Sequence, residues 1–395
     1  MFIDGQVSTD SGTTGILNRV IFSPAGARGG NISVLNRLAS PAQTASVWLM
    51  MPRLLILLVF LCALNHCPAQ TGKTDPQREA MAGRRLSADQ AGALEAAVTN
   101  HPDDLSARTQ LLGYYFGRQH SSPEAKTARQ KHIFWIIQNQ PEAVIAGLPY
   151  SSLNVILDGD AYSQAKQLWL EQTKAHDQSP KILGNAAQFF LINDRDLAEG
   201  LLKQAQTIEP KNPKWPDALG HLYALSEGGD KSAAAKSLAE FEKAQADDVS
   251  ESARFYRLDD LAKQAFAAGE IGKASQYASE LLAAAQKNPK DWNYGNAILH
   301  GNSVLGRIAL KQDDVKQAVQ FLLAAGQTPG SPQLNSFGPN MSLAQELLAK
   351  GETNAVVQYF ELCRKFWRSG AGKLDDWTKA VKAGQAPDFG ANLSY

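Results

Sequence analysis

A recurring helical pattern is the feature that most constrains the fold of this 395-residue chain. From about residue 86, Ala- and Leu-rich stretches of about 10–17 residues alternate with short breaks containing Gly, Pro, Asn or Asp. Runs of alternating Val, Ile and Thr, which are typical of strands, are nearly absent. Ser87 with Gln90 three residues later is a capping-box pattern, and Gly384 follows the last helical stretch. The sequence therefore predicts an all-α protein.

The helical stretches resemble one another, and their spacing is similar to that of the tetratricopeptide repeat (TPR) family. Repeats of that family are helix pairs of about 34 residues. Small residues at the eighth and twentieth positions let the two helices approach closely, and large residues fill the remaining space. The segments that carry the resemblance are Leu305-Gly306-x-x-Ala309 with Ala318, Leu322 and Ala325; Leu343-Ala344-x-x-Leu347 with Val356, Phe360 and Cys363; Leu261-Ala262-x-x-Ala265 with Ala274, Ala278 and Leu281; Leu219-Gly220-x-x-Tyr223 with Ala234, Leu238 and Phe241; and Ala186 and Phe189 with Ala198, Leu202 and Ala205.

The resemblance implies an α-solenoid of antiparallel helix pairs that form a right-handed superhelix. It covers residues 86–367 with about six to seven pairs, irregular at 141–160, and the fourth of the segments above needs an insertion around Gly228-Gly229. Residues 368–395 are expected to hold a capping helix and a tail. Phe389 and Leu393 of this tail either cover the apolar edge of the last repeat or belong to a loose end.

The resemblance also implies a mode of binding. In the TPR family, the second, fifth, ninth and twelfth positions of each first helix line a concave groove that holds peptide or protein segments. Carried onto the matched repeats, these positions are Lys214, Asp217, His221, Tyr256, Asp259, Lys263, His300, Ser303, Arg307, Met341 and Gln345. Such a mixture suits a peptide held by hydrogen bonds and a few ion pairs. The alternative is that these side chains form only the solvated face of a scaffold.

The first 69 residues differ from the repeats. Residues 1–50 contain no lysine and little amphipathic periodicity, so they are interpreted as unstructured or as a mis-assigned extension ahead of a start at Met50 or Met51. Residues 51–69 combine a short positive start, an apolar run and a small residue at the end, which is typical of a secretory signal peptide. Cleavage after Ala69 would leave residues 70–85 as a linker and give an exported, periplasmic or secreted protein.

Two alternatives for this segment stay open. Residues 54–67 could act as an uncleaved membrane anchor, although the apolar run is shorter than the roughly 20 residues that span a bilayer. Lipidation at Cys67 is the other alternative, but His66 stands where a small residue is required.

Composition narrows the range of partners. The chain has 39 basic and 39 acidic residues, whereas nucleic-acid binders carry a strong basic excess to neutralise phosphates. We therefore expect no nucleic-acid partner, and the TPR resemblance implies a protein or peptide partner. Cys363 is the one cysteine beyond the signal segment, and its apolar neighbours predict a buried side chain.

No pattern of catalytic, metal-binding or cofactor-binding residues is evident. No two of the seven histidines lie within a helical turn of each other, so no zinc site is predicted. Ser163 and Lys166 match a Ser-x-x-Lys motif without its companion elements, and the segment Gly269 to Lys273 departs from a phosphate-binding loop and is interpreted as a turn between helices. Carboxylate pairs such as Asp259-Asp260 are interpreted mainly as helix caps.

These observations predict a non-catalytic, protein-binding repeat scaffold of the bacterial envelope that needs no cofactor. The alternative is an exported helical-repeat hydrolase or lyase whose acidic residues converge only in the fold. Buried acids or histidines with shifted pKa values in a pocket would favour that alternative. A purely structural role, marked by a large exposed apolar patch, is the third.

Overall fold

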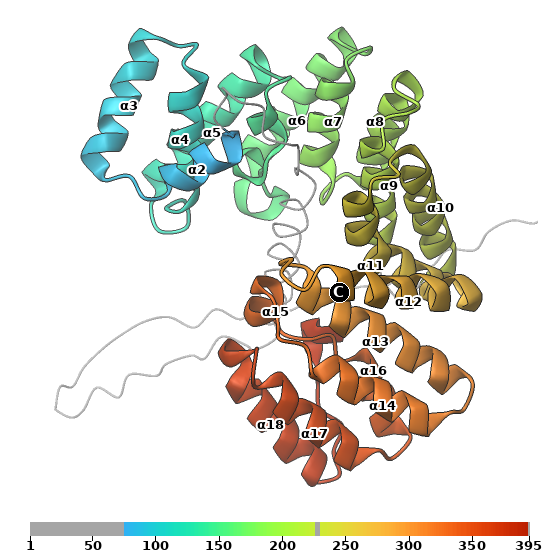
Figure 1. Ribbon diagram of the computed structural model, residues 1–395. Coiled ribbons are helices and arrows are strands. Elements are labelled where there is room, and N and C mark those ends of the chain that lie inside the picture. The colour runs from blue at the N-terminus through green and yellow to red at the C-terminus, as the bar shows by residue number, and fades with distance from the viewer. Residues whose placement is uncertain (1–74, 226–229, 394–395) are drawn as a thin grey trace, which may run out of the picture. The chain divides into compact units, whose positions relative to one another are not determined.

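The computed structural model describes residues 75–225 and 230–393 (Figure 1). Within these ranges the chain forms seventeen α-helices, α2 to α18, four short 3-10 helices, η1 to η4, and no strand. The prediction of an all-α protein is confirmed for this part of the chain. The N-terminal extension, the signal or anchor segment and the insertion at Gly228-Gly229 lie outside the described residues. None of the helices in the described ranges is both long and apolar enough to cross a bilayer.

From residue 180 onward, most helices pack as neighbouring antiparallel pairs, which Figure 1 colours from green to red. The second helix of one pair also packs against the next pair, so that the pairs form a continuous series. The pairs are α7 (Pro180–Phe190) with α8 (Arg195–Ile208), α9 (Lys214–Ala224) with α10 (Lys231–Asp247), α11 (Glu251–Ala268) with α12 (Ile271–Lys287), α13 (Tyr294–Lys311) with α14 (Val315–Gly326), and α16 (Ser342–Ala349) with α17 (Thr353–Cys363).

Glycines sit where helices of this series approach most closely. A Cβ atom added to Gly220 on α9 would lie 2.7 Å from ring atoms of Phe241 on α10. The hydroxyl of Ser237 donates to the carbonyl of Gly220 across the same contact, at 2.7 Å. A Cβ atom on Gly306 would lie 2.4 Å from a methyl group of Leu343. Gly220 and Gly306 are therefore needed for the packing of these helices.

Helix boundaries follow local sequence signals. Ser87 and Gln90 form both hydrogen bonds of the predicted capping box at the start of α3, at 3.2 and 2.9 Å. Gly384 has a φ of 73°, and Gly269 ends α11 with a φ of 88°, both in the left-handed region that glycine adopts at low cost. Gly269 therefore lies in the predicted turn between two helices.

The N-terminal part of the described chain differs from the expectation in one respect. Residues 76–83, expected within a linker, form helix α2. Asp75 caps this helix, Pro76 occupies its first turn, and Gly83 lets it pack closely on α4, because an added Cβ would lie 2.0 Å from a backbone oxygen of Gln110. The helices that follow are α3 (Ala88–Asn100), α4 (Leu105–Phe116), α5 (Pro123–Asn139) and α6 (Val155–Ala175).

The segment between α5 and α6, expected to be irregular, contains two 3-10 helices, η1 (Val144–Gly147) and η2 (Pro149–Ser151). The buried Arg129 of α5 holds this segment by donating to the carbonyls of Tyr150 and Ser152, at 2.8 and 2.6 Å. Gly159 interrupts the first turns of α6 with a φ of 37°.

The C-terminal residues pack back onto the last pair. Phe389 is buried against the rings of Phe360 and Trp377, and Asn392 donates to the carbonyls of residues 337 and 339. Of the two alternatives for the tail, the covering arrangement is the one observed, and it also buries Met341. The elements involved are α15 (Pro332–Phe337), η3 (Arg368–Gly370), α18 (Ala371–Lys382) and η4 (Gly390–Leu393).

Candidate functional site

The predicted groove residues lie on the first helices of four successive pairs, α9, α11, α13 and α16, except Met341, which immediately precedes α16. Six side chains from three of these helices meet in what we call the polar cluster: Asp217, Arg257, Asp259, Asp260, Lys263 and His300. Four of these six, Asp217, Asp259, Lys263 and His300, were predicted from the sequence, whereas Arg257 and Asp260 were not.

The first link of the polar cluster joins α9 to α11. Nε of the buried Arg257 donates to Oδ1 of Asp217 at 2.8 Å. Arg257 also donates to Oε1 of Gln245 on α10, at 3.2 Å. A buried ion pair costs desolvation that only good geometry and additional hydrogen bonds offset. This pair meets that requirement and fixes α9 relative to α11.

The second link joins α11 to α13. Nδ1 of His300 lies 2.7 Å from Oδ2 of Asp259, and Nζ of Lys263 lies 3.0 Å from the same oxygen. Lys263 stands one helical turn after Asp259 on α11. The contacts of Lys263 and of His300 with Asp259 both fall on the same carboxylate oxygen. The other oxygen, Oδ1, is buried without a hydrogen-bond partner, as is Nε2 of His300. The side chains of His300, Asp259 and Lys263 are 4 %, 13 % and 22 % exposed, so these three side chains lie just below the surface.

Burial and neighbouring charges set the ionisation of this cluster. Burial raises the pKa of Asp259, but its contacts with His300 and Lys263 and their hydrogen bonds outweigh this effect, so the pKa lies well below its usual range. Burial lowers the pKa of Lys263, but the charges of Asp259 and Asp260 raise it above its ordinary value. Both groups are therefore ionised near neutral pH.

Asp260 behaves differently. Its pKa is raised, first by burial and then by the charges of Asp259 and Asp217, which exceed the attraction of His221 and Lys263. No ion pair within the described ranges includes Asp260. The polar cluster thus has more negative charge than its own cations balance.

A further polar contact extends the same face from α13 to α16. Both Nε and Nη2 of Arg307 contact Oε1 of Glu346, at 2.9 and 2.7 Å. The guanidinium of Arg307 also lies over the ring of Phe266, 4.4 Å from its centroid. Gln345 is exposed beside Glu346 on α16.

The remaining predicted residues have separate positions. Lys214 is exposed at the start of α9 with its ammonium 4.6 Å from the centroid of the Trp215 ring. His221 packs edge-on against Phe241. Tyr256 donates to Asp291 and stacks on Trp292, and Ser303 donates to the carbonyl of residue 299 within its own helix. Met341 is fully buried beneath the C-terminal tail, so it presents no surface to a ligand.

The sequence did contain a signal for the residues that were missed. Asp259 and Asp260 lie in the middle of an 18-residue helix, where an acidic pair cannot cap the helix start. The interpretation of such pairs as caps holds for Asp104 and Asp314, which accept from backbone N–H groups of their helices. The interpretation as caps does not hold for Asp259 and Asp260 on α11, which interact with residues of α13 and α9.

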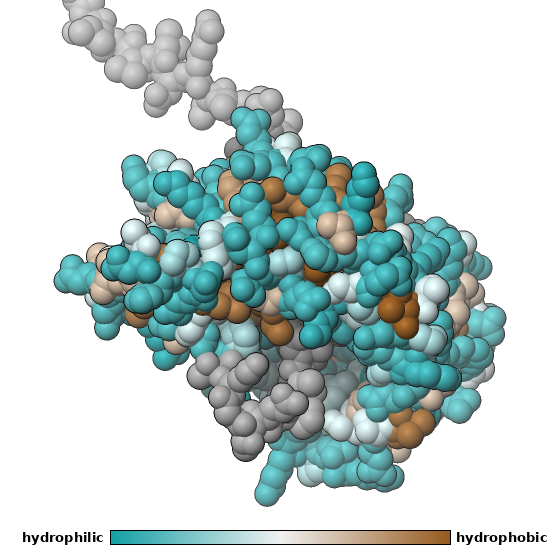
Figure 2. All heavy atoms as spheres, turned by 90° about the horizontal axis from the view of Figure 1, so that it is seen from above, coloured by the Kyte–Doolittle hydropathy of each residue, from teal (hydrophilic) through white to brown (hydrophobic). Residues whose placement is uncertain are grey.

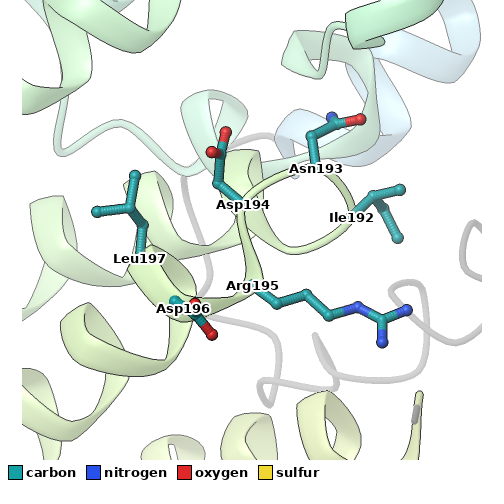
Figure 3. Close-up of a pocket in the computed structure, with 6 residues that line it drawn as sticks. All are labelled: Ile192, Asn193, Asp194, Arg195, Asp196 and Leu197. Atoms are coloured by element: carbon teal, nitrogen blue, oxygen red, sulfur yellow. The ribbon is translucent and has the colours of Figure 1, made fainter. Parts of the chain in front are cut away.

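A hollow lies at the turn between α7 and α8, away from the polar cluster. It has a volume of about 450 Å³, and the described residues that line it run from Ile192 to Leu197 (Figure 3). Figure 3 shows the side chains of Asp194 and Arg195 extending away from each other. Asp194 is engaged by Lys166 at 2.6 Å and by Tyr162, while Ser163 donates to the backbone, so the Ser-x-x-Lys match places no lysine beside its serine. We find no converging reactive groups at this hollow.

Other features that would indicate a site are limited. In the described ranges, no three His, Cys, Asp or Glu side chains are placed to hold a metal ion.

Figure 2 shows one face that is largely hydrophilic with separated hydrophobic areas. Val155, Ile156 and Leu157 are exposed together at the start of α6. Cys363 is buried as predicted, and burial raises the pKa of its thiol well above the usual range.

Comparison with known proteins identifies no relative. No protein-family model matches the sequence, and no curated protein is significantly similar to it. The functional argument therefore depends on the residues and contacts described above.

Proposed function

We propose that this protein is a TPR-like helical-repeat scaffold that binds a protein or peptide segment along the first helices of its pairs. The mature protein acts in the bacterial envelope, after removal of the signal peptide predicted at residues 51–69. No cofactor is needed for this role.

The sequence separation of the contacts supports a repeat. Asp217 and Arg257 are 40 residues apart, His300 and Asp259 are 41 apart, and Arg307 and Glu346 are 39 apart. Each contact therefore joins similar positions on the first helices of adjacent pairs. In a solenoid, each repeat contacts only its neighbours, which produces this regular spacing. We infer a right-handed superhelix in which these first helices lie side by side.

The polar cluster is the observation that carries the proposed binding. A first helix packed only for stability would be served by apolar side chains, because buried ion pairs are often no better than well-packed hydrophobic residues. Here α11 instead places Arg257, Asp259, Asp260 and Lys263 within two turns. Charged residues that are partly buried together despite the cost of desolvation are candidates for recognition.

The proposal can be tested with the full-length protein on an array of random synthetic dodecapeptides. We expect a subset of related peptides to bind, and Lys263→Ala to alter that binding, because Lys263 belongs to the polar cluster. Lys316→Ala is the matched control, because Lys316 is an exposed lysine on the second helix of the next pair. An array without bound peptides, or binding reduced equally by both variants, would contradict the proposal.

A second candidate, a hydrolase or lyase, is favoured by the Asp259–His300 pair. An ionised carboxylate only accepts hydrogen bonds, so Nδ1 of His300 is the donor and Nε2 is the basic nitrogen. This is the orientation of a general base held by a carboxylate. Activity on ester, peptide or glycoside substrates that is abolished in His300→Gln would establish the enzyme in place of the scaffold.

Export has its own test. Mass spectrometry of the protein recovered from fractionated native cells should find a mature N-terminus near Gln70. An intact chain that begins at Met1 inside the cell would refute export and leave the binding proposal unaffected.

A further inference from the structure

The polar cluster has unused capacity to accept hydrogen bonds. Both contacts to Asp259 fall on Oδ2, and Oδ1 has no hydrogen-bond partner. Nε2 of His300 has none either, and His300 is only 4 % exposed. Because Nδ1 donates to the carboxylate, Nε2 of the neutral ring is an acceptor. A buried polar atom without a partner is costly, so two such atoms in one contacting pair indicate a group that supplies hydrogen-bond donors.

The charge of the cluster points to the same kind of group. Arg257 neutralises Asp217, and Lys263 neutralises Asp259. Asp260 remains, with neighbouring carboxylates on its own helix and on α9 and only His221 and Lys263 to attract it. A carboxylate that is half-buried among other carboxylates favours binding of a cation.

Asp260 and Lys263 are both partly exposed at the surface of the cluster. Lys263 is also the residue whose ammonium contacts Asp259. The lysine side chain is flexible and its ammonium makes its contact through a single oxygen. It can therefore move to admit a second donor without repacking the helices.

We propose that Asp259, Asp260 and His300 form a binding site for the cationic side chain, lysine ammonium or arginine guanidinium, of a partner segment. Both groups carry several N–H donors and a positive charge, which the acceptors and the excess carboxylate require. This inference rests on the proposed scaffold function and specifies the chemistry of its ligand. The site selects partner segments that contain lysine or arginine. Arg307 and Glu346, farther along the same face, neutralise each other's charge and add no preference for basic segments.

The test uses the same dodecapeptide array with the full-length protein. We expect bound peptides to be enriched in Lys and Arg, and replacement of their key lysine by norleucine or arginine by citrulline to weaken binding about tenfold, as loss of a charged hydrogen bond does. Asp260→Asn should cause a similar loss and remove the enrichment. Asp376→Asn on α18, an exposed carboxylate outside the cluster, should leave binding unchanged. Thermal melting of both variants checks that the fold persists, because Asp260 has no hydrogen bond to lose within the described ranges.

The outcomes separate this inference from the scaffold function. Bound peptides that are acidic or apolar, and that still depend on Lys263, would overturn the cationic site and leave the scaffold standing. An array without any bound peptide overturns both. A free diamine, 1,5-diaminopentane, is the competing source of the same chemistry. If it binds as tightly as the peptides do, the site is for a small amine and the partner segment is refuted.

Discussion

Replacement of Gly220 by alanine tests whether the helices of a pair approach as the repeat pattern requires. The added Cβ atom would lie 2.7 Å from two ring carbons of Phe241. Phe241 is fully buried, so its ring cannot swing away into solvent. Overpacking of this kind costs about 1–3 kcal/mol, whereas the change from glycine to alanine inside a helix contributes about 1 kcal/mol in the opposite direction. We expect a net destabilisation of about 1 kcal/mol.

A double-mutant cycle isolates the contact. Phe241→Ala alone should cost about 3–5 kcal/mol, because it empties a buried ring site. In that background the Cβ of Gly220→Ala meets no ring, and the substitution should stabilise by about 1 kcal/mol. The two effects of Gly220→Ala therefore differ by about 2 kcal/mol, within the range observed for residues in contact.

Amide hydrogen exchange in α9 and α10 is the appropriate assay, because it reports the local opening of these two helices separately from the rest of the chain. Each 1.4 kcal/mol corresponds to about a tenfold change in protection. Gly200→Ala on α8 is the matched control, since its Cβ would meet no atom within 4 Å and should increase protection. If Gly220→Ala increases protection as Gly200→Ala does, the close approach is refuted.

Four further predictions concern single residues. Arg257→Ala should lower the free energy of unfolding by about 2–3 kcal/mol, because it leaves the half-buried carboxylate of Asp217 unpaired, whereas no change in denaturant midpoint would contradict the ion pair. Ser87→Ala should cost about 1 kcal/mol and increase hydrogen exchange at the start of α3 only. Burial and then the hydrogen bond to Asp291 raise the pKa of Tyr256 to about 12, so its contribution to stability is present below pH 10 and is lost as the pH rises toward 12; the stability difference from Tyr256→Phe should shrink over that window. Cys363 should react with a thiol reagent only after unfolding, and rapid labelling of the native protein would contradict its burial.

Local features of the fold could be predicted because their causes are local. The capping box at Ser87, the glycine ends at Gly269 and Gly384, and the helical periodicity all depend on residues within one or two turns. Helix α2 was missed because its polar sequence gives little signal alone. It is stabilised by close packing of Gly83 on a helix about 30 residues later in the sequence, and no local pattern reveals that contact.

The candidate site was predictable only in part. Repeat positions pointed to Asp217, Asp259, Lys263 and His300, which the fold does bring together. The same positions also pointed to Met341, which the tail covers, because the path of the last residues is not encoded in the repeat.

By itself, the sequence determined the helical class, the helix ends and the positions of the small residues, since each follows from propensity and from spacing along one helix. Only the tertiary structure decided which charges meet. Asp259 and His300 are 41 residues apart, and their contact depends on how two helices lie side by side. The same packing leaves one carboxylate oxygen and one imidazole nitrogen without partners, because hydrogen bonding is satisfied in three dimensions and not along the chain.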